Sequence, residues 1–196
     1  METQNKSNPL FPVFLKLEKL KVLIVGGGNV ALEKLNAILN NSPGTDLTLV
    51  APAILPEIAQ LASQHPNIKL KARVFFPGDL FTADLVIAAT DDRELNKTVQ
   101  EEAKKQRILV NVADTPDLCD FYLGSIVRKG DLKIAISTNG KSPTLAKRIK
   151  ELLNDSFPED TQNVLDNLHI IRKKLNGNFS EKMKKLNDIT SVLVSR

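Results

Sequence analysis

Three consecutive glycines between a strand-like run and a helical pattern are the residues best suited to hold a ligand. They follow the apolar run at residues 22–25 and form the spacing Gly26-x-Gly28-x-x-Ala31. This is the spacing of a dinucleotide-binding turn, with alanine as the third small residue. Gly26 permits the tight turn, Gly28 lets the backbone approach a pyrophosphate, and the helix start offers free N–H groups. The alternative is a glycine turn with a structural role only.

Asp114 is the residue best placed for acid–base chemistry. It follows the strand-like run at residues 108–112, and ligands of open parallel sheets bind beyond the carboxyl ends of the strands. Residues 50–53 and 90–92 follow other predicted strands, so the topology gathers them on the same edge as the glycine turn. A carboxylate there could act as a general base or hold a cation. The alternative is a turn aspartate that precedes Thr115-Pro116.

Other candidate residues carry weaker signals. Asp91 and Asp92 precede a helical pattern, which is typical of helix caps. His65 and His169 have no cysteine or histidine at ligand spacing, so no metal site is predicted. Cys119, the single cysteine, has no histidine nearby in the sequence and is predicted to be a packed thiol or a bystander without a role in catalysis.

Sequence alone does not distinguish NAD from NADP. An acidic residue about 20 positions beyond the glycines is expected to bind the adenosine ribose. The second predicted strand ends instead in Val50-Ala51-Pro52, and no arginine stands there for a 2′-phosphate.

Strand and helix patterns alternate five times over about 110 residues. Strands are expected at residues 22–25, 46–50, 68–74, 83–90 and 108–112, and helices at 30–40, 54–64 and 93–106. The alternation predicts an α/β fold with a Rossmann-type, doubly wound parallel sheet. Residues 1–9 are expected to be a flexible lead, residues 11–17 a short extended segment, and residues 75–80 a loop.

The pattern changes after Asp114. Alternating apolar residues on either side of a turn at residues 129–131 predict an antiparallel hairpin, which either extends the sheet or pairs across a dimer. Ser142-Pro143 is a helix start, and residues 144–153, 161–175 and 180–193 are predicted to be helices. The expected organisation is a nucleotide-binding domain at residues 1–113, a dimerisation region at 114–143 and a small helical domain at 144–196.

Composition favours a globular cytoplasmic protein. Of 196 residues, 42% are hydrophobic and 26% are charged, no apolar run reaches about 18 residues, and the polar N-terminus is unlike a secretory signal. A lone cysteine agrees with a reducing compartment. We therefore expect no membrane segment.

The net charge of +4 comes from the C-terminal part. Residues 1–140 carry 16 basic and 16 acidic side chains, whereas residues 141–196 carry 11 and 7. Without interleaved aromatic residues for base stacking, nucleic acid is not the expected partner. An acidic small molecule and a solvated helical face remain as alternatives.

Several segments in the same order resemble the precorrin-2 dehydrogenase/sirohydrochlorin ferrochelatase family of siroheme synthesis. They are residues 11–15 (FPVFL), 25–31 (VGGGNVA), 88–92 (AATDD), 111–114 (NVAD) and 137–143. The resemblance covers nearly the whole chain and is to the stand-alone form of the enzyme, without a methyltransferase domain.

The resemblance implies which residues form the site. NAD contacts would come from Gly26, Gly28, Asn29, Val30, Pro52, Ala53 and Thr90, with Asp114 as the catalytic residue and with Thr138 and Ser142 bordering the tetrapyrrole. Many relatives have aspartate at position 29, and since both side chains can cap a helix, little consequence is expected.

The implied activity is NAD-dependent oxidation of precorrin-2 to sirohydrochlorin, with insertion of ferrous iron as a possible second activity. Both tetrapyrroles are rich in carboxylates, so the basic C-terminal region is expected to attract them. The family implies a homodimer. The alternative from a different class is a nucleotide-sensing module without catalysis.

Overall fold

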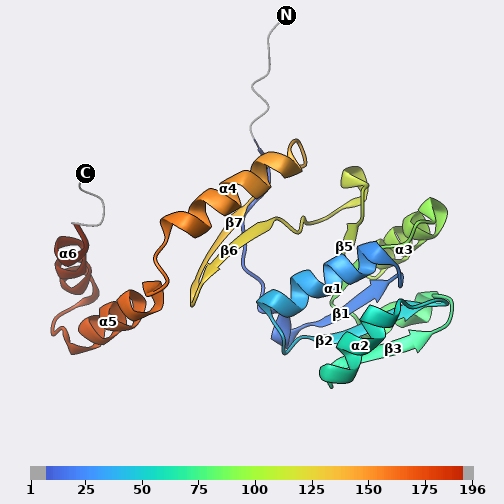
Figure 1. Cartoon of the computed structure of the whole chain (residues 1–196), viewed down its shortest axis with the longest axis horizontal. Coiled ribbons are helices and arrows are strands. Elements are labelled where there is room, and N and C mark those ends of the chain that lie inside the picture. The colour runs from blue at the N-terminus through green and yellow to red at the C-terminus, as the bar shows by residue number, and fades with distance from the viewer. Residues whose placement is uncertain (1–7, 192–196) are drawn as a thin grey trace, which may run out of the picture. The chain divides into compact units, whose positions relative to one another are not determined.

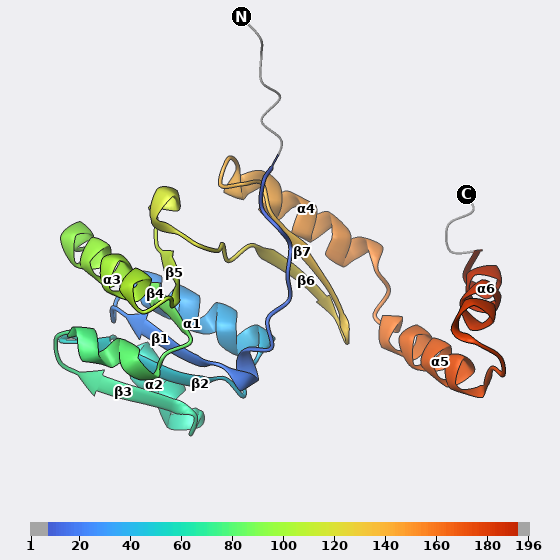
Figure 2. The same cartoon turned by 180° about the vertical axis from the view of Figure 1, so that it is seen from behind.

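The computed structural model describes residues 8–191, which form two compact units. The first runs from Pro9 to Leu123, and the second contains residues 124–191 together with Asn8. Figures 1 and 2 show the units from opposite sides. No helix within residues 8–191 is long and apolar enough to cross a membrane.

The first unit is built on a five-stranded parallel sheet with the order β3-β2-β1-β4-β5 (Figure 1). Its strands are β1 (Lys21–Val25), β2 (Asp46–Ala51), β3 (Ile68–Ala72), β4 (Leu85–Ala88) and β5 (Leu109–Val112). The chain moves outward from β1 to β3 and then returns to the other side of β1, as in doubly wound sheets. The predicted Rossmann-type fold is confirmed, followed by a hairpin and a helical C-terminal region.

Helices cover both faces of the sheet, which explains why the central strands are apolar almost throughout. Val22 and Ile24 pack in one buried cluster with side chains of α1 (Asn29–Asn41) and α2 (Pro56–Gln64). Leu23 and Val25 face the other side, where they pack with α3 (Arg93–Lys105). All four residues of β4 are buried, as expected for a central parallel strand.

The strand order reverses between β1 and β4. Val25 pairs with Ala88 at the carboxyl end of both strands, although 63 residues separate them in sequence. Helices that follow β1 and β4 leave toward opposite faces and open a crevice at this point. Ligands of open α/β sheets bind in such a crevice.

The helix starts refine two sequence expectations. Asp92, and not the pair Asp91-Asp92, caps α3, since its carboxylate accepts hydrogen bonds from the N–H groups of Glu94 and Leu95, both at 3.0 Å. Gly28 is the N-cap residue of α1, and no side chain caps this helix. Asn29 is the first residue of α1 and its side chain does not act as a cap, so capping is not the reason why aspartate and asparagine would be equivalent there.

Short 3₁₀ helices replace parts of the expected loops. Leu17–Lys19 forms one before β1, and the expected extended segment at residues 11–17 forms no strand, with Phe11 and Phe14 exposed to solvent. Pro77–Thr82 forms another because Pro77 suits a first turn and the Asp79 carboxylate accepts a hydrogen bond from the Phe76 N–H group. A third, Pro116–Leu118, follows β5.

The first unit extends about ten residues beyond the predicted boundary at residue 113. Side-chain hydrogen bonds tie the segment after β5 back to that strand, and two of them span the same distance in sequence. The Val110 N–H group donates to the Asp120 carboxylate at 3.0 Å, and the Asn111 amide donates to the Phe121 carbonyl at 2.8 Å. Each pair spans ten residues, so the segment belongs to the sheet domain.

The second unit contains the predicted hairpin and three helices. Its elements are β6 (Ser125–Lys129), β7 (Leu132–Ile136), α4 (Pro143–Ser156), α5 (Thr161–Lys174) and α6 (Phe179–Thr190). The hairpin turns at Gly130, whose φ of 61° suits glycine. Ser142 caps α4 by accepting a hydrogen bond from the Leu145 N–H group at 3.1 Å, and Pro143 occupies the first turn, as predicted.

Two expectations reach outside the described residues. Most of the flexible lead predicted for residues 1–9 lies there, and so does the predicted end of the last helix at residue 193. Within the described residues, α6 ends at Thr190.

Candidate functional site

The glycine turn brings the ends of β1, β2 and β4 into close contact. Gly26 has a φ of 126°, and a Cβ atom there would lie 2.3 Å from the Ala89 carbonyl oxygen. A Cβ atom on Gly27 would lie 2.2 Å from the carbonyl oxygen of Ala53. Both positions therefore exclude any side chain. Gly27 is a position that the dinucleotide motif leaves open and that only the packing of the loop after β2 demands.

Gly28 differs from the two glycines before it, because nothing lies within 4 Å of the place where its Cβ would be. It begins α1, whose first turn contains no acidic residue and no side-chain cap. The first N–H groups of α1 are thus not satisfied by a side chain, and the positive end of the helix dipole is not neutralised. Such a helix start is suited to bind an anion.

The loop after β2 forms the next wall of the site. The Leu55 N–H group donates to the Gly27 carbonyl at 2.9 Å, which fixes residues 52–55 against the glycine turn. Pro52 and Ala53 are placed beside the turn by this bond, at the edge where the sequence predicts the adenosine part of a dinucleotide.

Thr90 follows β4 and is held by a buried asparagine. Asn96, which is 4% exposed, donates from its amide nitrogen to the Thr90 carbonyl at 2.9 Å. The Asn96 amide oxygen lies 2.8 Å from the Thr90 hydroxyl and 3.2 Å from the Thr90 backbone nitrogen. Asn96 did not emerge from the sequence as a site residue, because an asparagine inside a helix carries no signal of its own.

Asp114 stands in the turn after β5 with an exposed side chain. Its φ of 55° is left-handed, a conformation that aspartate and asparagine tolerate better than most residues. The turn is held to the sheet because the Ala113 N–H group donates to the Ala88 carbonyl at 2.9 Å. Asp114 thus lies at the same edge of the sheet as the glycine turn.

One cavity of about 990 Å³ brings these residues together. Every residue predicted to contact the cofactor lines it, together with Asp114: Gly26, Gly28, Asn29, Val30, Pro52, Ala53 and Thr90. The middle glycine of the turn, Gly27, also lines the cavity, and further lining residues that the sequence did not indicate are Ile54, Leu55, Val74, Phe75 and Leu95. The volume is at the upper end of the range for small-molecule sites.

The charged groups that line this cavity are all acidic. They are Asp91, Asp92 and Asp114, and no lysine, arginine or histidine is among its described lining residues. Positive potential at the cavity therefore comes from backbone N–H groups at the start of α1, and not from side chains.

Asp79 fixes the segment after β3 that contributes Val74 and Phe75 to the cavity. Its side chain is 1% exposed, and burial by itself would raise the pKa. Hydrogen bonds from Arg73, at 2.8 Å and 2.5 Å, and from Lys71, at 3.1 Å, outweigh burial and lower the pKa to about 2. Lys71 and Arg73, which are close to this wall in the sequence, are thereby paired with the Asp79 carboxylate.

Thr138 and Ser142, the predicted substrate residues, lie in the second unit and contact each other. The Ser142 N–H group donates to the Thr138 hydroxyl at 3.1 Å, and that hydroxyl lies 3.1 Å from the Ser142 carbonyl oxygen. The two residues close the loop at residues 138–142, in which Asn139 and Gly140 have left-handed backbones.

Cys119 packs at the edge of a buried cluster, as the sequence predicts. Burial raises the pKa of its thiol, although the Val112 N–H group donates to the sulfur at 3.2 Å. The thiol lies 3.1 Å from the Val112 carbonyl oxygen. Its contacts are structural.

Comparison with known proteins agrees with the fold and with the motif. Residues 13–125 match the family described as "Putative NAD(P)-binding", and residues 129–156 match the family described as "Sirohaem biosynthesis protein central". The solved structure of "SirC, precorrin-2 dehydrogenase" superposes with a TM-score of 0.74 and 30% identity, over 92% of this chain and 89% of that one. The chain belongs to the precorrin-2 dehydrogenase/sirohydrochlorin ferrochelatase family. The resemblance noted in the sequence is thereby confirmed.

Curated members of the family include longer proteins. The chain is 38% identical to siroheme synthase 3 of Aeromonas hydrophila subsp. hydrophila over 169 residues, which cover 86% of this chain and 36% of that protein. It is 41% identical to siroheme synthase of Methylococcus capsulatus over 147 residues, or 75% of this chain and 30% of that protein. The chain thus spans about a third of the length of the curated relatives that it matches.

Proposed function

We propose that the chain acts in siroheme biosynthesis as an NAD-dependent dehydrogenase that oxidises precorrin-2 to sirohydrochlorin. The observation that carries the proposal is that Asp114 lines the same cavity as the glycine turn. An acceptor for a proton and a site for a dinucleotide are the two elements that such an oxidation needs.

The residues around the cavity fit a dinucleotide. Gly28 and the uncapped start of α1 would hold the pyrophosphate. The other parts of the dinucleotide would be contacted by Asn29, Val30, Pro52, Ala53 and Thr90. NAD fits better than NADP because no cation lines the described cavity and both Arg73 and Lys71 are engaged by Asp79.

Asp114 would take the proton that the oxidation releases. Conversion of precorrin-2 to sirohydrochlorin removes one hydride and one proton from the macrocycle. The nicotinamide, when bound, supplies the hydride acceptor. The C–H or N–H bond that loses the proton leaves its electron pair on the macrocycle, and the Asp114 carboxylate accepts the proton and then passes it to water.

Asp114→Asn is the direct test. Asparagine tolerates the left-handed backbone at this position, so the variant keeps the turn and removes only the basic carboxylate. We expect NADH formation from precorrin-2 and NAD to fall by about 10²-fold or more, with NAD affinity changed less than about 3-fold.

Asp117→Asn is the matched control. Asp117 is an exposed carboxylate three residues further on and does not line the cavity, so the same change of charge should leave the rate unaltered. A normal rate in Asp114→Asn would remove Asp114 from the mechanism. Binding of NAD without any conversion of precorrin-2 by the unmodified protein would favour the nucleotide-sensing alternative.

Ferrous iron insertion into sirohydrochlorin is a second candidate activity. Metal insertion displaces pyrrole protons, and the exposed Asp114 carboxylate is a suitable acceptor for them. Anaerobic incubation with sirohydrochlorin and ferrous iron should then form siroheme faster than the uncatalysed reaction. Rates equal to that background would limit the chain to the oxidation step.

The proposal includes the second unit. Thr138 and Ser142 would border the tetrapyrrole, and the β6–β7 hairpin with the C-terminal helices would form a homodimer. In its favour, β6 and β7 form a two-stranded sheet of their own among the described residues, and a hairpin of two strands gains stability by packing against further structure. Light scattering on the purified protein should give twice the mass of the chain.

A further inference from the structure

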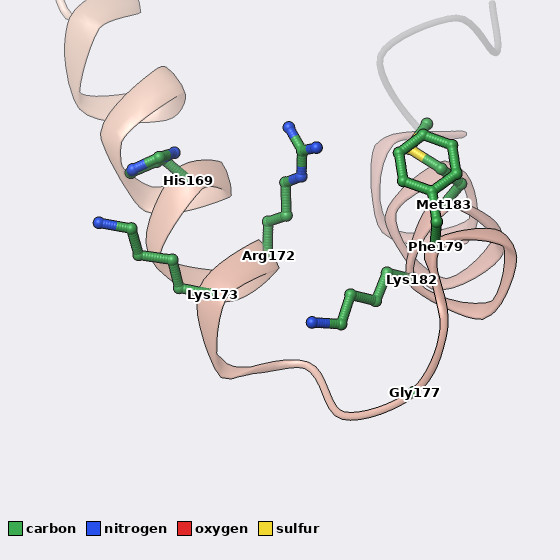
Figure 3. A pocket seen from close by; sticks show the side chains of 7 residues that line it. All are labelled: His169, Arg172, Lys173, Gly177, Phe179, Lys182 and Met183. Atoms are coloured by element: carbon green, nitrogen blue, oxygen red, sulfur yellow. The ribbon is translucent and has the colours of Figure 1, made fainter.

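A second hollow, of about 490 Å³, lies between α5 and α6 and is lined by basic side chains (Figure 3). We call it the basic hollow. His169, Arg172 and Lys173 come from α5, and Lys182 comes from α6. Figure 3 shows Arg172 and Lys182 extending from the two helices into the space between them.

No carboxylate neutralises this group within the described residues. The ion pairs between residues 8–191 involve neither Arg172, Lys173 nor Lys182. Glu181 is close in sequence, but its carboxylate accepts a hydrogen bond from the Asn178 N–H group at 3.2 Å in a capping box. It is thereby engaged at the start of α6.

The turn between the helices depends on glycine. Gly177 has a φ of 113°, and a Cβ atom there would lie 2.2 Å from a Glu181 carboxylate oxygen. The turn and the capping box thus fix Glu181 together, and α6 places Lys182 on the side that faces α5.

The remaining wall of the basic hollow is apolar. Phe179 is 70% exposed and Met183 is 37% exposed, so neither side chain is buried in a hydrophobic core. An aromatic ring and a thioether form a good surface for a flat conjugated ring system. Cations beside such a surface match a planar ligand that carries several carboxylates.

A favourable helix dipole explains only part of the cluster. Arg172 and Lys173 lie in the last turn of α5, where cations are stabilised by the helix end. Lys182 lies near the start of α6, where the dipole disfavours a cation. The helix dipole therefore does not account for its position at the hollow.

We infer that the basic hollow binds the carboxylates of the tetrapyrrole, with Phe179 and Met183 against the ring system. This inference rests on the proposed function. It gains weight from the cavity of the first unit, because no lysine, arginine or histidine among its described lining residues could pair with those carboxylates.

Binding of uroporphyrin, an octacarboxylic porphyrin, tests the hollow without catalysis. Arg172→Gln/Lys182→Gln should weaken binding by about 10-fold or more, and coproporphyrin, with fewer carboxylates, should bind the unmodified protein more weakly. Lys184→Gln/Lys185→Gln is the matched control, since it removes the same charge from exposed positions of α6 outside the hollow. Circular dichroism would show that both variants keep their helices.

Equal affinity of the two double variants for uroporphyrin would overturn the inference. If both variants retain binding, the hollow is not the site, and if both lose it, net charge alone explains the binding. Precorrin-2 oxidation separates the inference from the proposed function. A higher KM with an unchanged kcat in the hollow variant supports both, and an unchanged KM overturns the role of the hollow alone. Selective loss of uroporphyrin binding in a protein without oxidation would support the hollow and reject the dehydrogenase.

Discussion

Asn96 holds Thr90 at the edge of the cavity through both ends of its carboxamide. The amide nitrogen donates to the Thr90 carbonyl at 2.9 Å, and the amide oxygen accepts at 3.2 Å from the Thr90 N–H group. The arrangement joins the first turns of α3 to the end of β4, which is where a dinucleotide would cross the sheet.

Asn96→Ala should therefore destabilise the protein and weaken nucleotide binding together. Loss of the buried carboxamide leaves two backbone groups of Thr90 without partners, which costs about 1–3 kcal/mol. Urea denaturation and NAD titration would measure the two effects. Thr98→Ala, at an exposed position of α3, should change the free energy of unfolding by less than about 0.5 kcal/mol. A loss of stability with unchanged NAD affinity would separate Asn96 from the site.

Asp79 should make the stability depend on pH in acid. Its folded-state pKa of about 2 lies below the ordinary value of 3.8, so the unfolded chain binds more protons between these values. The stabilisation is present above about pH 5 and is lost as the pH falls toward 2, by about 2 kcal/mol in total. Urea denaturation of the unmodified protein and of Asp79→Asn at several pH values isolates the contribution of Asp79 to the free energy of unfolding, because the other carboxylates titrate in both proteins. Parallel pH profiles would contradict it.

Substitution by alanine should mainly affect stability at Gly27 and mainly affect NAD binding at Gly28. Gly27→Ala forces a methyl group against the Ala53 carbonyl and should lower the free energy of unfolding by more than about 2 kcal/mol. Gly28→Ala meets open space and should cost less than about 1 kcal/mol, yet it places a methyl group where the backbone is expected to approach the pyrophosphate.

Thermal unfolding and NAD titration of both variants distinguish these effects. We expect Gly28→Ala to melt close to the unmodified protein and to bind NAD about 10-fold or more weakly. Unaltered NAD affinity in Gly28→Ala would place the nucleotide elsewhere.

Cys119 should react slowly with alkylating reagents in the folded protein. Burial raises the pKa of the thiol and reduces the thiolate fraction near neutral pH, and the sulfur contacts the Val112 backbone. Labelling with iodoacetamide at pH 8 should be about 10-fold or more slower than labelling in urea. Similar rates in both conditions would show that the segment after β5 opens readily.

The sequence by itself determined the sheet, the glycine turn and the edge on which chemistry would occur. Those features are local: apolar runs of strand length, a turn that needs glycine at residue 26, and a cap at Ser142 each follow from a few adjacent residues. The rule that ligands bind beyond the carboxyl ends of parallel strands then placed Asp114 with the glycines, and both line one cavity.

Only the tertiary structure decided which residues support that edge. Gly27 is needed because the Ala53 carbonyl packs against it, Asn96 reaches back six residues to Thr90, and Asp120 ties the segment after β5 to Val110. The cations of α5 and α6 likewise share a hollow only once the turn at Gly177 brings the helices together. No sequence motif or periodic pattern pairs these residues with one another, so the sequence does not indicate the contacts between them. The contacts form only when the folded chain brings the residues within bonding distance.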